Sequence, residues 1–138
     1  MGLVYAEIEL VNEIDIALAK KHYIREEEIK RITVTALVDS GSYMLAINEN
    51  IQEYLQLPVV DKRRAQLATG EVIECDVVSP LELRFKNRKT TCRAMVLPGD
   101  AEVLMGSIPL EDLDVLIDPL RQELIVHPDH PDMAYTRL

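Results

Sequence analysis

A short polar run, Asp39-Ser40-Gly41-Ser42, carries the side chains of this sequence best suited to chemistry. It follows the β-branched segment from Arg31 to Val38, which predicts a strand that ends in a tight loop. A carboxylate in this position lies at the edge of the core, where partial burial disfavours its charged form and suits it to proton transfer. Gly41 permits a turn that a side chain would obstruct, and the two serine hydroxyls can orient the carboxylate or bond to another chain.

One carboxyl group cannot act as both acid and base in the hydrolysis of a peptide bond. Two carboxyl groups held together can share a proton, so that one accepts a proton while the other donates one. The sequence contains no second Asp-Ser-Gly and no Asp-Thr-Gly. A second copy of the chain would therefore have to supply the other aspartate.

The remaining segments predict a mostly antiparallel β domain. Residues 3–10 alternate apolar and polar side chains, as in a half-buried strand, and Ile14, Ile16 and Leu18 continue that pattern. The charged stretch from Lys20 to Glu28 has no predicted shape. Asn48 is expected to cap a short helix over 49–56, and Pro58 prevents its continuation.

The second half of the chain predicts further strands over 65–68, 72–85, 90–97, 115–117 and 123–126. The first three are joined by turns at Thr69-Gly70 and at 86–89. Residues 107–113 predict a second short helix with Pro109 in its first turn. Residues 1–126 are thus expected to form one domain, followed by a tail over 127–138.

Three parts of the sequence resemble the retropepsin-like aspartic proteases. Ala36 to Ser42 looks like the active-site strand and loop of that family. Val103-Leu104-Met105-Gly106, followed by residues 108–113, is similar to a second family element, two apolar residues and a glycine before a short helix. Between them, the hairpin with Leu67 to Gly70 at its turn matches the position of the flap that closes over substrate. The likeness covers residues 3–126.

The resemblance implies a closed β barrel with one or two short helices, and a homodimeric endopeptidase with one Asp39 from each chain. A water molecule between the two carboxyls would attack a polypeptide substrate, with no metal or organic cofactor. The resemblance implies that Ser40 makes hydrogen bonds to the other chain, that Gly41 contacts the substrate and that Ser42 bonds the outer carboxylate oxygen of the aspartate. It also implies that the flap residues cover the substrate, namely Ala68, Thr69 and Gly70. Leu104, Met105 and Gly106 would have a structural role.

The sequence departs from the retroviral members at two linked positions. Those members have a basic residue after the glycine of the second element and an acidic partner after the catalytic loop. This chain has Ser107 and Tyr43 there. The dimer would therefore have to be braced differently.

Charge and cysteine content narrow the function classes. The 138 residues include 24 acidic and 15 basic side chains, and the net charge of -9 repels phosphate backbones and anionic lipids. The basic runs at 62–64 and 86–89 are short and suit solvated loops. The first ten residues carry Glu7 and Glu9, unlike a secretory signal, so a cytoplasmic protein with Cys75 and Cys92 reduced is expected.

Other interpretations of these residues stay open. Asp39 can be a simple turn residue, and Gly106 can mark only a close approach of helix and strand. The run from His127 to Asp132 offers metal-ligand types, although a proline-broken tail rarely fixes their geometry. A serine hydrolase would need a Gly-x-Ser-x-Gly elbow, which is absent. A dimeric binding module with the same fold but no catalysis is the main alternative to an endopeptidase.

Overall fold

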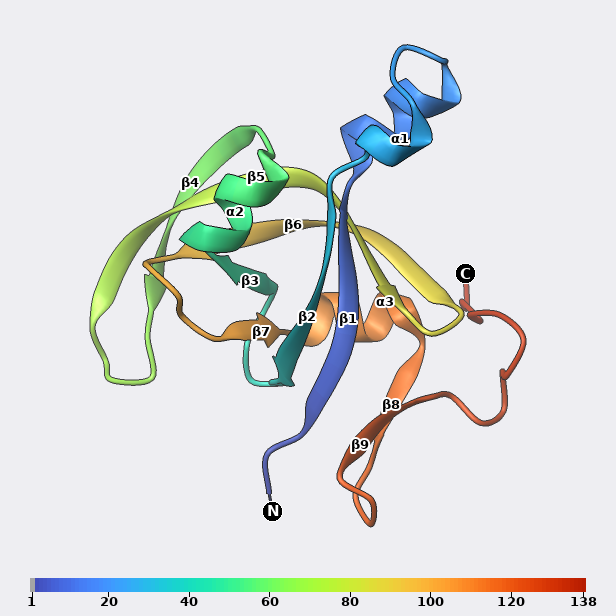
Figure 1. Ribbon diagram of the computed structural model, residues 1–138. Coiled ribbons are helices and arrows are strands. Elements are labelled where there is room, and N and C mark those ends of the chain that lie inside the picture. The colour runs from blue at the N-terminus through green and yellow to red at the C-terminus, as the bar shows by residue number, and fades with distance from the viewer. Residues whose placement is uncertain (1) are drawn as a thin grey trace.

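The computed structural model describes residues 2–138 and shows a closed barrel of six strands (Figure 1). The strands follow one another around the barrel in the order β1 (Tyr5–Asn12), β2 (Arg31–Val38), β7 (Val103–Met105), β3 (Leu45–Asn48), β6 (Arg88–Leu97) and β5 (Val72–Phe85). Pairing of β5 with β1 closes the ring. The β2–β7 and β3–β6 pairs are parallel and the other pairs are antiparallel, so the predicted fold class is confirmed.

The predicted alternation of the first strand builds the barrel core. Ala6, Ile8 and Leu10 point inward and are at most 6% exposed, while Tyr5 and Glu7 face solvent. Because successive side chains of a strand point to opposite faces, this pattern fixes which face of β1 is buried. The same core takes in buried residues of α2 and α3 described below.

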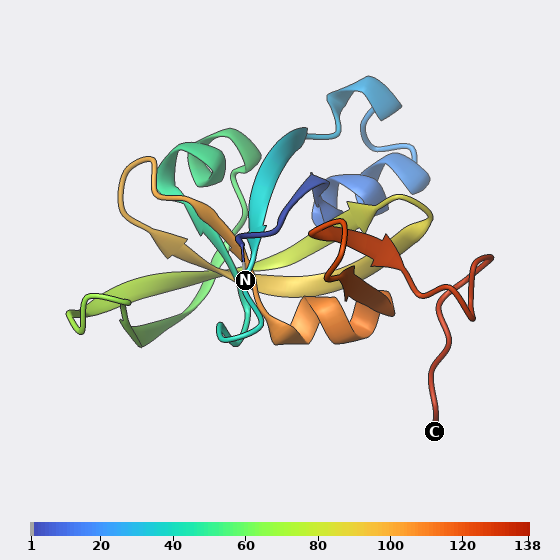
Figure 2. The same ribbon diagram turned by 90° about the horizontal axis from the view of Figure 1, so that it is seen from below.

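One barrel strand, β5, extends beyond the barrel and forms a hairpin with a further strand. β4 (Val59–Gln66) pairs with the first half of β5, from Val72 to Val78, whereas β1 pairs with the second half, from Leu81 to Arg84. The register of β5 against β6 shifts between Val78 and Leu81. Figure 2 shows the hairpin reaching out from one side of the barrel, while the C-terminal tail extends on the other side.

Residues 2–138 form three short α-helices and one 3-10 turn: α1 (Glu13–Lys20), η1 (Glu26–Glu28), α2 (Glu49–Leu55) and α3 (Ser107–Leu113). The predicted helices α2 and α3 are confirmed, and Asn48 caps α2 by accepting from the Ile51 amide at 2.9 Å. The prediction that the first strand continues through Ile14, Ile16 and Leu18 is wrong, because these residues belong to α1. The buried Asn12 side chain ends the strand by accepting from the amides of residues 14 and 15.

The two strands predicted after α3 are confirmed as β8 (Val115–Asp118) and β9 (Glu123–Val126), and they pair with one another in a separate two-stranded sheet. The hairpin β4–β5 is longer than predicted, since β4 begins at Val59, and the turn before β6 comprises only Lys86 and Asn87. Cys75 and Cys92 are both free thiols. In the described part of the chain, no helix has the length and apolar content needed to cross a membrane.

Candidate functional site

Asp39 lies directly after β2, where the barrel holds its backbone in place. The strands β2 and β7 run parallel, with Val38 opposite Met105, and the Asp39 amide donates to the Met105 carbonyl oxygen at 3.0 Å. The side chain is half-buried. The carboxylate therefore sits at the end of a packed strand pair, with one side against the protein and the other open.

The loop residues orient this carboxylate through its two oxygens. The Gly41 amide donates to Oδ1 at 3.0 Å, and the Ser42 hydroxyl donates to Oδ2 at 2.9 Å. The Ser42 amide also donates to the Asp39 carbonyl oxygen at 3.0 Å. Ser40 is exposed, and within residues 2–138 its hydroxyl makes no hydrogen bond. Gly41 and Ser42 thus fix the orientation of the Asp39 carboxylate, while the Ser40 hydroxyl stays exposed at the surface.

Gly106 supports the loop from behind because its backbone fits directly against the loop backbone. A Cβ atom on Gly106 would lie 2.7 Å from the carbonyl oxygens of Ser42 and Met44. The next two amides complete the contact, since Ser107 donates to the Ser42 carbonyl at 2.9 Å and Ile108 donates to the Tyr43 carbonyl at 3.0 Å. The start of α3 and the aspartate loop therefore form one rigid unit.

The predicted flap residues lie at the turn of the β4–β5 hairpin. The turn is closed by bonds from the Gly70 amide to the Leu67 carbonyl at 2.9 Å and from the Leu67 amide to the Glu71 carbonyl at 2.8 Å. Gly70 has a φ of 90°, which favours glycine. Ala68 and Gly70 line the same groove as Asp39, whereas Thr69 is exposed at the tip and does not line it.

The groove between the loop and the flap has a volume of about 750 Å³. Its floor is apolar, because Met44, Ala46, Met95 and Leu97 pack there as a second cluster beside the barrel core, with Leu104 at its edge. Met105, by contrast, is fully buried in the main core. Such a groove suits an extended apolar segment of polypeptide.

Several residues that line the groove could not be predicted from the sequence. The floor residues come from β6 and from β3 with the residue before it, and these two strands pair in parallel with Ala46 opposite Met95. Residues 44–47 and 94–97 are both continuous apolar runs, so nothing local shows which of their side chains face the groove or that the two runs meet. Arg63 and Arg64 also line the groove, although their run looked like a solvated loop and in fact lies within β4.

A single chain contributes only one carboxylate to this groove. Of the residues described, Asp39 is the sole acidic residue in its lining. Where a retroviral ion pair would brace the loop, this chain has a 3.4 Å contact from the Ser107 hydroxyl to the Tyr43 carbonyl. The geometry of one chain thus provides an oriented carboxylate, a flap and an apolar floor.

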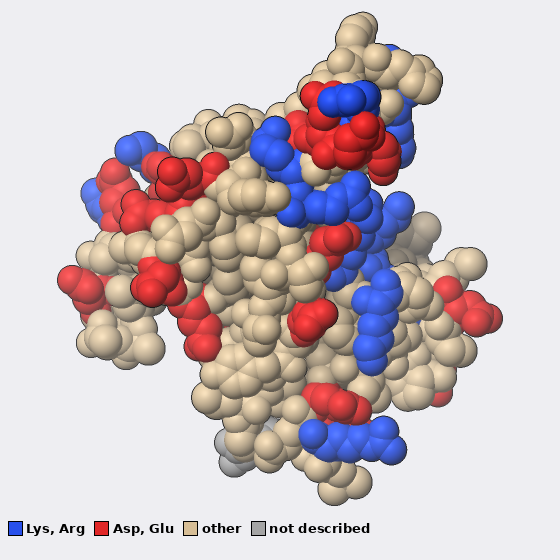
Figure 3. Space-filling model, viewed as in Figure 1, with Lys and Arg blue, Asp and Glu red and all other residues tan. Residues whose placement is uncertain are grey.

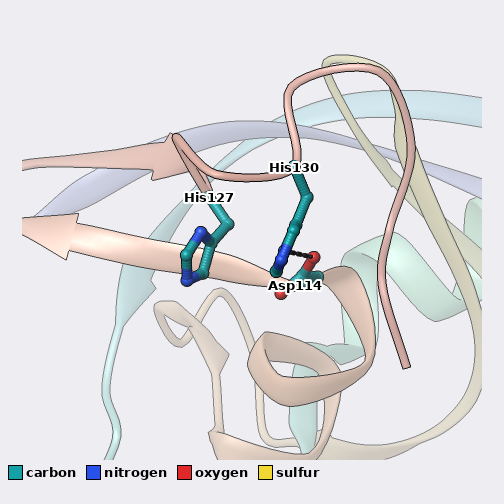
Figure 4. A group of neighbouring side chains, drawn as sticks. All are labelled: Asp114, His127 and His130. Atoms are coloured by element: carbon teal, nitrogen blue, oxygen red, sulfur yellow. Dashed lines mark hydrogen bonds and ion pairs between the residues drawn. The ribbon is translucent and has the colours of Figure 1, made fainter. Parts of the chain in front are cut away.

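A second group of polar side chains lies where the tail meets the end of α3 (Figure 4). Asp114, His127 and His130 bring possible metal-ligand atoms within 4.8 Å of one another. One nitrogen of each ring already has a partner: His130 Nδ1 is 2.8 Å from Asp114 Oδ2, and His127 Nδ1 accepts from the Asp129 amide at 3.1 Å. The buried Arg88 guanidinium lies 3.7 Å from the same Asp114 oxygen and would repel a cation. We interpret this group as a tail clasp rather than a metal site.

The tail clasp predicts a pH-dependent release of the tail. The Tyr135 amide and the hydrogen bond with His130 hold the pKa of Asp114 below its ordinary value of 3.8. A carboxyl group whose pKa is lowered by folding stabilises the folded state above its ordinary pKa, and this contribution is lost as the pH falls through the folded value. We expect the tail to detach only in strong acid, below pH 3.8, as followed by the NMR shift of the Tyr135 amide.

Two substitutions separate the tail clasp from general acid unfolding. Asp114→Asn removes the titrating carboxyl but keeps an oxygen that can accept from the Tyr135 amide, so the acid-induced change in the shift of this amide should be lost. Asp112→Asn removes an exposed charge two residues earlier and should leave that change in place. The same acid-induced change in the Asp114→Asn chain would contradict the role given to this carboxylate.

Comparison with known families gives one match. The model of a family described as aspartyl protease matches residues 27–117, which include the aspartate loop, the hairpin and the start of α3. No curated protein shows significant similarity to the chain.

Proposed function

This chain belongs to the aspartyl protease family, and from that premise we propose that it is an endopeptidase active as a homodimer. The observation that carries the proposal is the Asp39 carboxylate, oriented by Gly41 and Ser42 at one end of a groove with an apolar floor and a flap. An extended polypeptide would lie in this groove between the flap turn and the floor.

The proposed chemistry needs the Asp39 carboxyls of two chains. One carboxylate takes a proton from a water molecule as the water oxygen bonds to the peptide carbonyl carbon. The other carboxyl donates its proton to the carbonyl oxygen, so that a diol forms. The first carboxyl then gives its proton to the nitrogen, the C–N bond breaks, and a diol hydroxyl returns a proton to the second carboxylate as the new carboxyl end forms. The Ser40 hydroxyl, which is exposed and makes no hydrogen bond within residues 2–138, would bond across the dimer.

The surface around the aspartate loop supports a dimer. Leu3 and Tyr5 precede and begin β1, next to the end of β2, and are 67% and 44% exposed. Tyr43 and Ile108 flank the loop on its other side and are 62% and 42% exposed. On the face shown in Figure 3, charged side chains crowd over α1 and η1 and are sparser near the N-terminus. Apolar side chains gathered at one end favour burial against a second copy.

Leu3→Arg is expected to weaken the dimer about tenfold or more, because it places a charge in an apolar contact. Tyr54→Arg is the matched control, since Tyr54 is 55% exposed on α2, at the other end of the barrel (Figure 1). Sedimentation equilibrium measures the dimer, and activity per chain at several protein concentrations measures its consequence. Equal weakening by both substitutions would place the interface elsewhere.

The direct test is incubation with reduced, unfolded protein over a series from acidic to neutral pH, with mass spectrometry of the new chain ends. The proposal expects cleavage within the substrate chain, increasing with time, and none with the Asp39→Asn chain. Binding of the substrate without cleavage at any pH would favour the dimeric binding module. Equal cleavage by both chains would point to a contaminant and contradict the assignment.

A further inference from the structure

Arg63 stands out as a cation on the inner face of the flap hairpin. On β4, the side chains of Arg63, Ala65 and Leu67 are half-buried, while Lys62, Arg64 and Gln66 alternate with them on the exposed face. Ala65 and Leu67 pack against the apolar floor cluster. Arg63 lies opposite the buried Cys75, and its Nη1 contacts the Met44 sulfur at 3.8 Å. Its guanidinium therefore points toward the groove.

Arg63 lacks the carboxylate partner that its neighbour has. Lys62 lies 3.8 Å from both Glu74 and Asp76. Arg63 has no carboxylate within 4.0 Å anywhere in residues 2–138, although the chain carries 24 acidic residues. Partial burial of an unpaired cation is unfavourable unless an opposite charge comes to it. A bound ligand can supply that charge.

Protection of the sheet edge is the simpler explanation for an inward charge. β4 is the edge strand of its sheet, and a charged side chain there discourages pairing with other chains. Such protection works equally well with a positive or a negative side chain. Recognition of a carboxylate requires a positive one, so reversal of the charge in an Arg63→Glu chain distinguishes the two explanations.

We propose that Arg63 selects polypeptides that carry an acidic side chain next to an apolar segment. The apolar segment lies on the floor formed by Met44, Met95 and Leu97, and the Asp or Glu side chain pairs with the guanidinium at the base of the flap. This inference rests on the proposed function, since it names the substrate class of the same groove. Arg64 is on the exposed face of β4 and adds positive charge at the margin.

The test uses pairs of fluorescent peptides that are identical except for Glu or Gln, with that residue moved stepwise along an apolar sequence. Binding is measured by anisotropy to full-length chains carrying Asp39→Asn, so that no cleavage is needed. We expect one position at which Glu binds about tenfold more tightly than Gln, with the preference falling as salt is raised. Absence of any Glu preference at every position would overturn the proposal.

Substitutions of Arg63 assign the preference to this side chain. Arg63→Gln should abolish it, Arg63→Lys should keep part of it, and Arg63→Glu should reverse it in favour of a Lys peptide. Lys62→Gln is the matched control, since this side chain is outside the groove lining, and should retain the full preference. A preference unchanged in Arg63→Glu would overturn the proposal, and circular dichroism confirms that each chain is folded.

The same peptides separate failure of this inference from failure of the proposed function. Cleavage of Glu and Gln peptides at equal rates by the wild-type chain would leave an endopeptidase without the Arg63 selectivity. A Glu preference in binding, without cleavage by the wild-type chain, would keep the recognition and remove the catalysis.

Discussion

Chains with Asp39→Asn are expected to lose cleavage by about 10³-fold, within the range that general acid–base catalysis contributes. Both chains of the dimer then carry an amide, which neither takes a proton from the attacking water nor gives one to the leaving amine. The fold and the dimer should survive, because the Asn oxygen still accepts from the Gly41 amide. Initial rates on an unfolded protein, with the dimer measured in the same samples, check both parts.

Mixing wild-type and Asp39→Asn chains tests the need for two carboxylates. Random pairing of equal amounts leaves about half of the wild-type chains in fully wild-type dimers, so the rate should fall to about half of that of the wild-type protein alone. A rate unaffected by the mutant chains would mean that one Asp39 is sufficient. The symmetric mechanism would then be wrong.

Gly106→Ala is expected to destabilise the fold by about 3 kcal/mol, at the upper end of the usual range for overpacking. The added Cβ would lie 2.7 to 2.8 Å from three backbone atoms of Ser42 and Met44, none of which can rotate away. Relief requires the loop to move, so cleavage should fall together with stability. Urea unfolding monitored by circular dichroism gives the free energy of unfolding.

Ser107→Ala is the control at the neighbouring position. It keeps the amide that donates to the Ser42 carbonyl and removes only a hydroxyl whose contact with Tyr43 is long, at 3.4 Å. Its effect should stay within about 0.5 kcal/mol, as for most surface changes. If Gly106→Ala were as stable as Ser107→Ala, the close contact would not constrain the loop.

The parts of the fold that depend on neighbouring residues could be predicted from the sequence. The strand before Asp39, the cap at Asn48 and the glycine turn of the flap each have a local physical cause. The same reasoning wrongly predicted a strand where α1 lies. Ile14, Ile16 and Leu18 alternate with other residues over only five positions, and over that length the patterns of a strand and a helix cannot be told apart. The Asn12 cap and the acidic first turn were the signals to weigh instead.

Only part of the candidate site could be predicted from the sequence. The loop from Asp39 to Ser42 and the glycine at 106 are adjacent to elements that can be recognised by their residue types. The groove floor depends on the parallel pairing of β3 with β6, which joins residues about fifty positions apart and leaves no local trace. The tail clasp could not be predicted either, because it forms only where Asp114 meets His127 and His130 in space.

The division of β5 between two partners has a mechanical consequence. Its first half belongs to the hairpin that covers the groove, and its second half belongs to the barrel wall beside β1. The register shift between Val78 and Leu81 separates these two halves, so the hairpin half can bend while β5 stays paired with β1. We therefore expect access to the groove to depend on bending at this shift, at a distance from the turn at Gly70.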